Sequence, residues 1–177
     1  MLRLRKKHSR PPDPAMREVD GQALIDAQSL PRAALVATAV AAVLNIGWLW
    51  LSNVTDSFYH WYALLQGPLI GLAVQRAGRG IDWRFPTLAA LVTVVAAFSG
   101  NFLVSLMTTA TVLEQNALQV LRGLTVWSWQ TWQAEVLTAV DLVYALAAAG
   151  IAAFYAQRRL DRREIFALRS RNQDKGK

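Results

Sequence analysis

Four polar side chains interrupt the long apolar stretches of this chain, and their types suit hydrogen bonding or proton transfer. They are Asn45, Gln66, Asn101 and Asp141. Each lies near the middle of a different apolar stretch, and a helical rise of about 1.5 Å per residue predicts that they share one narrow layer of a bundle. An ionised carboxylate facing lipid at that depth costs at least ~2.5 kcal/mol. We therefore expect Asp141 to face the bundle interior or to be protonated.

Two interpretations of this polar layer are open. Amide and carboxyl groups on neighbouring helices can hydrogen-bond to one another and hold a bundle together, contributing roughly 0.6–2 kcal/mol for each contact. The same groups can relay a proton or an ion, or bind a small polar ligand, because ionisable residues inside a membrane often mark such pathways. The residue types fit both interpretations.

A second candidate site is the basic segment Arg76-Ala77-Gly78-Arg79-Gly80, which is followed by Arg84. Arginine side chains beside flexible glycines can bind phosphate, including the anionic headgroup of a lipid. The alternative is a basic turn that orients the flanking membrane segments. The segment is not a P-loop, because it lacks the GK[ST] sequence and a preceding strand.

Two glycines, Gly67 and Gly71, have the GxxxG spacing within an apolar stretch. Glycines four residues apart form a groove on a helix, where another backbone can approach closely. Alanines and a glycine over residues 147–153 give the last apolar stretch a similar small-residue face. These faces predict close helix packing, either within the chain or with a partner helix.

The sequence carries no motif for catalysis, metal binding or cofactor binding. It has no cysteine, and its only histidines are His8 and His60, which argues against thiolate and histidine-rich metal sites. Ser99 lies within an apolar stretch, as the serine of an intramembrane protease does, but the GxSxG context is absent. We therefore predict a protein that is not an enzyme and that needs no cofactor.

Four apolar segments must position these residues, and each is long enough to cross a bilayer core of roughly 30 Å as a helix. Within a transmembrane domain over residues 33–157, they extend over residues 33–51, 57–75, 86–110 and 136–157. We predict an all-α, four-helix transmembrane bundle with an interfacial segment between the third and fourth helices, which contains Trp127, Trp129 and Trp132. Residues 1–32 are predicted to be a basic, largely disordered segment, and residues 158–177 a basic tail.

The distribution of lysine and arginine predicts the orientation. Of the 19 basic residues, 7 lie in residues 1–32, 3 in the loop 76–84 and 8 in residues 158–177, all on one side of a four-span arrangement. Arg122 alone falls on the other side. The positive-inside rule then places both termini in the cytoplasm of a multi-pass protein of the cell inner membrane. This topology accounts for the net charge of +7 without a nucleic-acid partner.

Residues 69–101 resemble a group of small bacterial inner-membrane proteins. Their second and third spans carry an IG pair, a basic RxAGxG loop, an RF pair and a GN pair, which correspond here to Ile70-Gly71, Arg76 to Gly80, Arg84-Phe85 and Gly100-Asn101. The run from Asp141 to Ala145 is similar to the start of that group's last span, although Val143 and Tyr144 depart from it. The resemblance implies a membrane location and no particular activity. Some members carry a cysteine-rich metal-binding front end, which this chain lacks, so no metal role carries over.

We expect from these features a non-enzymatic integral membrane protein that acts by association, as an accessory subunit or a partner-binding factor. Its expected contacts are the bilayer, anionic lipid headgroups at the cytoplasmic face, and a protein partner or a second copy of the chain. The alternative is a small transporter or a proton- or ion-coupled protein that uses Asp141 together with Asn45, Gln66 and Asn101.

Overall fold

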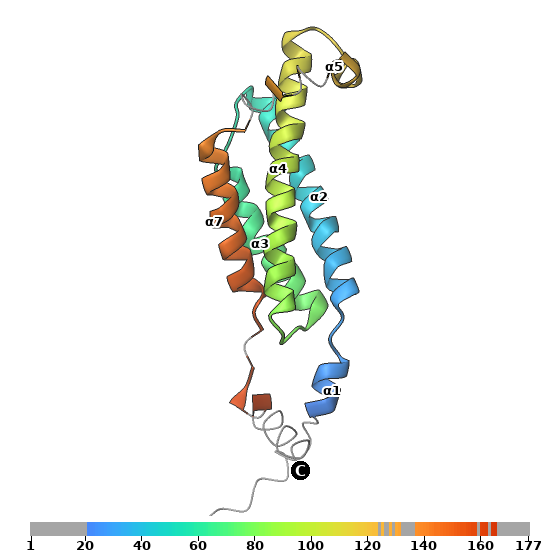
Figure 1. The fold of residues 1–177 in the computed structure, drawn as a ribbon, viewed down its shortest axis with the longest axis vertical. Helices are drawn as coiled ribbons and strands as arrows, with labels where there is room; N and C mark the ends of the chain where they lie inside the picture. The colour runs from blue at the N-terminus through green and yellow to red at the C-terminus, as the bar shows by residue number, and fades with distance from the viewer. Residues whose placement is uncertain are drawn as a thin grey trace, which may run out of the picture. The chain divides into compact units, whose positions relative to one another are not determined.

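The computed structural model describes residues 21–123, 125, 128, 130–131, 137–158, 160–162 and 164–165. In this part of the chain the regular elements are helices, as predicted: α1 (Gly21–Asp26), α2 (Leu30–Thr55), α3 (Tyr62–Gly78), α4 (Arg84–Val112), α5 (Ala117–Gly123) and α7 (Ala139–Ala156) (Figure 1). Residues 29–158 form one compact unit that contains α2 to α7, and α1 belongs to a second unit.

Several predictions concern residues outside the described ranges. They are the predicted disorder over residues 1–20, the predicted interfacial position of Trp127, Trp129 and Trp132, and the predicted tail beyond residue 165. Within the predicted interfacial segment the structure describes α5, which packs its buried Val120 against Leu106 and Ala110 of α4.

Three of the described helices, α2, α4 and α7, are long and apolar enough to cross a membrane. The helix α3 has 17 residues and contains Gln66 and Pro68. It begins at Tyr62, five residues later than the predicted start of the second span at residue 57. The delay follows from the end of α2, where Asp56 adopts a left-handed backbone with φ 48° and residues 57–61 form a non-helical connection.

The helices α2 and α7 both begin at hydroxyl residues that cap their first turns. The Ser29 side chain accepts a hydrogen bond from the Arg32 N–H, and Pro31 lies in the first turn, where its missing N–H costs nothing. The Thr138 side chain accepts from the Asp141 N–H in the same way. This cap starts α7 at Ala139, three residues after the predicted start of the fourth span at residue 136.

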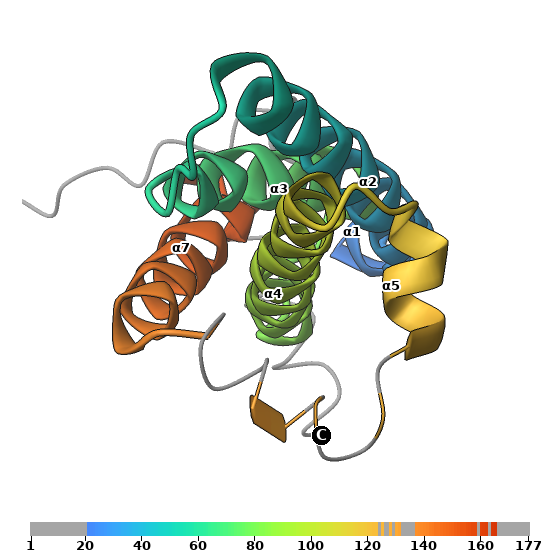
Figure 2. The ribbon, with the colours of Figure 1, turned by 90° about the horizontal axis from the view of Figure 1, so that it is seen from above.

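The four long helices are arranged as two central helices and two outer ones. The helices α3 and α4 contact each other and both contact α2 and α7, which lie on opposite sides of the central pair (Figure 2). The core of the half that holds the start of α2 is built largely from alanines with Ile70, Val74 and Phe85. The other half is built around Trp48, which stacks on Tyr62 at a ring-centroid distance of 5.3 Å.

The closest backbone approach joins α3 and α7, which run parallel. A Cβ atom added to Gly67 would lie 2.5 Å from the Ala148 carbonyl oxygen, and one added to Gly71 would lie 2.5 Å from the Ala152 carbonyl oxygen. The two small-residue faces found in the sequence therefore pack against each other within the chain. Because backbone atoms make both contacts, no side chain can move aside to make room for a larger residue.

We predict that Gly71→Ala lowers the free energy of unfolding by about 1–3 kcal/mol, because the new methyl group must push α3 away from α7. Gly150→Ala is the matched control, since Gly150 lies on α7 with no atom within 4 Å of an added Cβ. That change should be neutral, or stabilising by up to about 1 kcal/mol through helix propensity. The measurement is unfolding of the detergent-purified protein by a denaturing detergent. Equal effects of the two substitutions would contradict the packing described for α3 and α7.

Candidate functional site

A buried chain of hydrogen bonds joins α2, α3 and α4. The Gln66 Nε2 donates to Asn45 Oδ1 at 2.8 Å, and Asn45 Nδ2 donates to Ser99 Oγ at 2.9 Å. Ser99 in turn donates to the Ala96 carbonyl oxygen. Gln66 is fully buried, and Asn45 is nearly so. Two of the four residues in the predicted polar layer are therefore in direct contact, with Ser99 as a third member.

The other two residues of the predicted layer, Asn101 and Asp141, lie apart from this chain of hydrogen bonds. Asn101 is buried on α4 and accepts a hydrogen bond from the Ser105 hydroxyl at 3.4 Å. Asn101 and Asp141 line the same small cavity, together with His60 and Trp48. Its volume of about 10 Å³ is at the lower limit for a single water molecule.

Asp141 has a capping role at the start of α7. Its Oδ2 accepts from the Thr138 N–H at 3.0 Å and from the Thr138 hydroxyl at 2.6 Å, which completes a capping box. Its Oδ1 lies 2.6 Å from His60 Nδ1. A carboxylate only accepts hydrogen bonds, so with Asp141 ionised His60 Nδ1 carries the donated hydrogen. Asp141 thus links α7 to the segment that precedes α3.

Sequence reasoning missed the partnership of His60 with Asp141. The spacing Thr138-x-x-Asp141 was the available signal, because a threonine followed three residues later by an acidic side chain is typical of a capping box. That reading places Asp141 in the first turn of its helix. It also places Asp141 at the level of the short connection that holds His60.

The three arginines of the predicted phosphate site, Arg76, Arg79 and Arg84, are all exposed. They lie where α3 ends and α4 begins. The glycines between them have a packing role, because a Cβ atom added to Gly78 would lie 2.5 Å from the Phe85 ring and one added to Gly80 would overlap that ring. The buried Phe85 therefore fixes the shape of the loop that presents the arginines.

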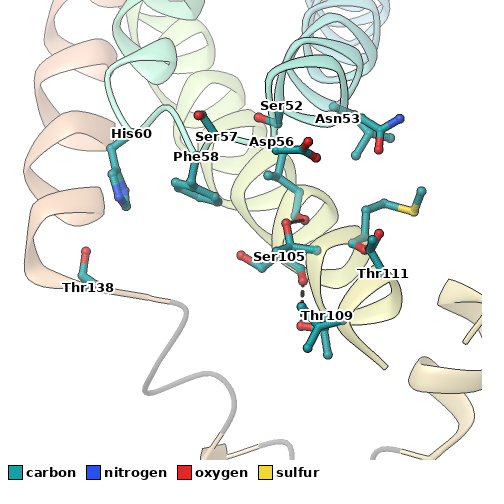
Figure 3. Close-up of a pocket in the computed structure, with 15 residues that line it drawn as sticks. Ser52, Asn53, Asp56, Ser57, Phe58, His60, Ser105, Thr109, Thr111 and Thr138 are labelled. Carbon is teal, nitrogen blue, oxygen red and sulfur yellow. Dashed lines mark hydrogen bonds between the residues drawn. The ribbon is translucent and has the colours of Figure 1, made fainter. Parts of the chain in front are cut away.

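At the other end of α4 the structure contains a pocket of about 550 Å³. The pocket lies between the last turns of α2, the connection that follows α2, the last turns of α4 and the residue before α7 (Figure 3). Its polar lining consists of Ser52, Asn53, Asp56, Ser57, His60, Ser105, Thr108, Thr109, Thr111 and Thr138, and its apolar lining of Leu49, Phe58, Val104, Met107 and Val112.

Most hydroxyl groups of this pocket donate their hydrogen within the protein. Thr108, Thr109 and Thr111 each donate to the carbonyl oxygen four residues earlier, at 2.8–3.0 Å. Ser57 donates to the Thr55 carbonyl oxygen at 3.0 Å. Each hydroxyl has one hydrogen and two acceptor lone pairs, so these groups retain acceptor capacity toward a ligand.

Ser52 differs from the other hydroxyl residues of the pocket. It is 8 % exposed, and its Oγ has no hydrogen-bond partner among the described residues. A buried hydroxyl without a partner costs free energy, and a ligand in the pocket can recover that cost by bonding to it. Within the described ranges, no three His, Cys, Asp or Glu side chains are grouped so as to hold a metal ion.

Sequence reasoning did not find this pocket. The residues around it come from three segments that the sequence separates widely, and several of them are ordinary helix-end or turn residues. The threonine-rich end of the third apolar stretch, which holds Thr108, Thr109 and Thr111, was the available signal.

Comparison with family models, curated proteins and solved structures found no match to this chain.

We predict that Asn45→Ala lowers the free energy of unfolding by about 1–2 kcal/mol, because it removes the acceptor of the buried Gln66 Nε2 and the donor to Ser99 Oγ. Asn53→Ala is the matched control, since Asn53 is exposed on the same helix. Its effect should stay within about 0.5 kcal/mol. Both are measured by unfolding of the purified protein in detergent, and equal losses would show that the buried hydrogen bonds contribute no stability.

Proposed function

We propose that this chain is an integral protein of the bacterial inner membrane that spans the bilayer four times, has both ends in the cytoplasm, and binds a small ligand at its outer face without converting it. The four spans of this proposal are α2, α3, α4 and α7. The proposal keeps the expected role of a non-enzymatic, accessory factor and assigns its binding function to the pocket at the ends of α2 and α4.

Large apolar side chains on the outside of the helices support the membrane location. Val43 and Ile46 on α2 are each 67 % exposed, Val95 on α4 is 66 % exposed, and Leu146 on α7 is 58 % exposed. Soluble proteins rarely expose so many large apolar groups along whole helices, whereas lipid chains solvate them. The shorter α3 packs between α2 and α7 and exposes Leu65 and Leu69, so it belongs to the same environment.

The basic residues support the orientation. Arg76, Arg79 and Arg84 lie at the end of the bundle where α2 begins, and the positive-inside rule assigns that end to the cytoplasm. Their exposed guanidinium groups are then positioned to contact anionic lipid headgroups. The pocket lies at the opposite end of α4 and, on this topology, opens toward the outer face.

The observation that carries the binding function is the pocket itself. Ligand sites commonly have volumes of roughly 300–1,000 Å³ and combine an apolar wall with a few polar groups, and this pocket of about 550 Å³ matches both features. The small-residue faces, for which packing within the chain and packing on a partner helix were both open, pack on each other through Gly67 and Ala148 and through Gly71 and Ala152. The pocket is therefore the better candidate for a binding surface.

The transport alternative has less support, because the polar groups do not continue through the bundle. On the cytoplasmic side of Gln66 the core is largely apolar and includes the fully buried Ala37, Ile70 and Val74. None of these three side chains lines the pocket or the small cavity beside Asp141. A relay through Asp141 would also have to release this residue from the cap of α7.

We predict opposite labelling of two exposed positions, because the chain has no cysteine of its own. A membrane-impermeant maleimide should label Asn53→Cys in intact spheroplasts and should label Arg79→Cys only after the membrane is broken. The unsubstituted chain is the blank control. Labelling of Arg79→Cys in intact spheroplasts would overturn the proposed orientation.

The same assay tests whether the pocket opens to the outside. Ser105→Cys, half-buried in the pocket, should react with a small impermeant methanethiosulfonate reagent in intact spheroplasts, and Ala96→Cys, buried on the same helix, should not. If Ser105→Cys is as unreactive as Ala96→Cys, the pocket is closed and the proposed binding function fails.

A further inference from the structure

Two helix ends contribute partial negative charge to the pocket. It is lined by the last turns of α2 and α4, and the C-terminal end of a helix carries a partial negative charge. The N-terminal end of α7 also borders the pocket through Thr138, but the Asp141 carboxylate caps that end and offsets its partial positive charge. Neither lysine nor arginine is among the residues that line the pocket.

Asp56 adds a full negative charge at an unfavourable position. Its carboxylate lies at the C-cap of α2, where the helix dipole favours a cation. Its backbone is left-handed, with φ 48°, a conformation that aspartate and asparagine adopt more readily than most residues other than glycine. Within the described ranges Asp56 has no ion-pair partner. A cation bound in the pocket would compensate both the carboxylate and the helix ends.

The hydrogen-bonding groups of the pocket also favour a donor-rich ligand. The hydroxyls of Ser57, Thr108, Thr109 and Thr111 already donate within the protein and offer acceptor lone pairs. The buried Ser52 hydroxyl lacks a partner among the described residues and can either accept or donate a hydrogen bond. A primary ammonium group has three N–H donors and no acceptor, which is the complement of this arrangement.

Part of the pocket lining is apolar. It includes Leu49, Phe58, Val104 and Met107. A ring such as that of Phe58 can pack against a hydrocarbon group or lie against a cation. The volume of about 550 Å³ exceeds that of an ammonium group alone and leaves room for an apolar body.

From these features we infer that the pocket binds an organic amine, in which a primary ammonium group bonds to Asp56 and the hydroxyls while an apolar group packs against the wall around Phe58. This inference rests on the proposed ligand-binding function and names its ligand class. The charge and the N–H groups of the ligand make separate contributions, and a matched series of probes can separate them.

The test uses the full chain purified in a mild detergent and three probes that share a phenethyl group. Phenethylammonium has both charge and N–H donors, its N-trimethylated derivative has charge alone, and phenethyl alcohol has no charge. Binding is measured by titration calorimetry at constant ionic strength. We expect phenethylammonium to bind about tenfold more tightly than the alcohol, with the trimethylated probe weaker than phenethylammonium.

The Asp56→Asn variant should weaken phenethylammonium binding about tenfold and leave binding of the alcohol unchanged. Asparagine tolerates the left-handed backbone well, so this variant should fold. Glu114→Gln is the matched control, because Glu114 is another exposed carboxyl residue at this end with a left-handed backbone, φ 53°, and it does not line the pocket. It should leave the affinity of every probe unchanged.

Equal affinity for the ammonium and the alcohol, no binding of phenethylammonium, or no effect of Asp56→Asn would each overturn the inference. Equal affinity for the primary and the trimethylated ammonium would overturn the assignment of a primary amine. The variant Thr108→Trp, which fills the pocket, separates a wrong ligand class from a wrong function. If phenethylammonium and the alcohol bind equally and this variant abolishes the binding of both, the pocket is a ligand site and only the amine class is wrong.

Discussion

The direct contact of the α3 and α7 backbones is the constraint on which the rest of the structure depends. Glycines on α3 lie against alanine carbonyl groups on α7, so the two helices cannot slide past each other without a clash. The pairs Gly67 with Ala148 and Gly71 with Ala152 share one register. The contact between His60 and Asp141 continues this register beyond the start of α3, and it fixes Thr138 at the wall of the pocket.

Polarity changes along the bundle in a way that suits both a membrane and a binding site. An alanine-rich core occupies the half that holds the basic loop, and the hydrogen-bonded Asn45 and Gln66 follow it. Aromatic packing around Trp48 then separates these amides from the pocket. Buried polar groups in lipid need internal partners, and the amides of the middle layer largely provide them for one another. The polar groups that line the pocket lie at the end of the bundle opposite the basic loop.

The existence of the long helices could be predicted from the sequence, because uninterrupted apolar runs of bilayer length rarely form any other structure. The residues at which the helices begin and end could not be predicted, because they depend on local hydrogen bonds such as the Thr138 cap and on the left-handed backbone of Asp56. The contact of Asn45 with Gln66 was predictable from depth alone, whereas the contact of Asp141 with His60 depends on where α7 starts. The pocket was not predictable, because its lining comes together only through the tertiary packing.

The register of α3 against α7 is tested most directly by cross-linking in the membrane. The natural chain has no cysteine, so a double variant with cysteines at positions 60 and 141 carries no background thiol. The account predicts that a short bifunctional thiol reagent joins these two cysteines efficiently. A second double variant with cysteines at positions 60 and 148 should fail to react, because position 148 lies about 10 Å farther along α7 than position 141. Efficient joining of positions 60 and 148 but not of 60 and 141 would contradict the packing from which the fold, the Asp141 contact and the pocket all follow.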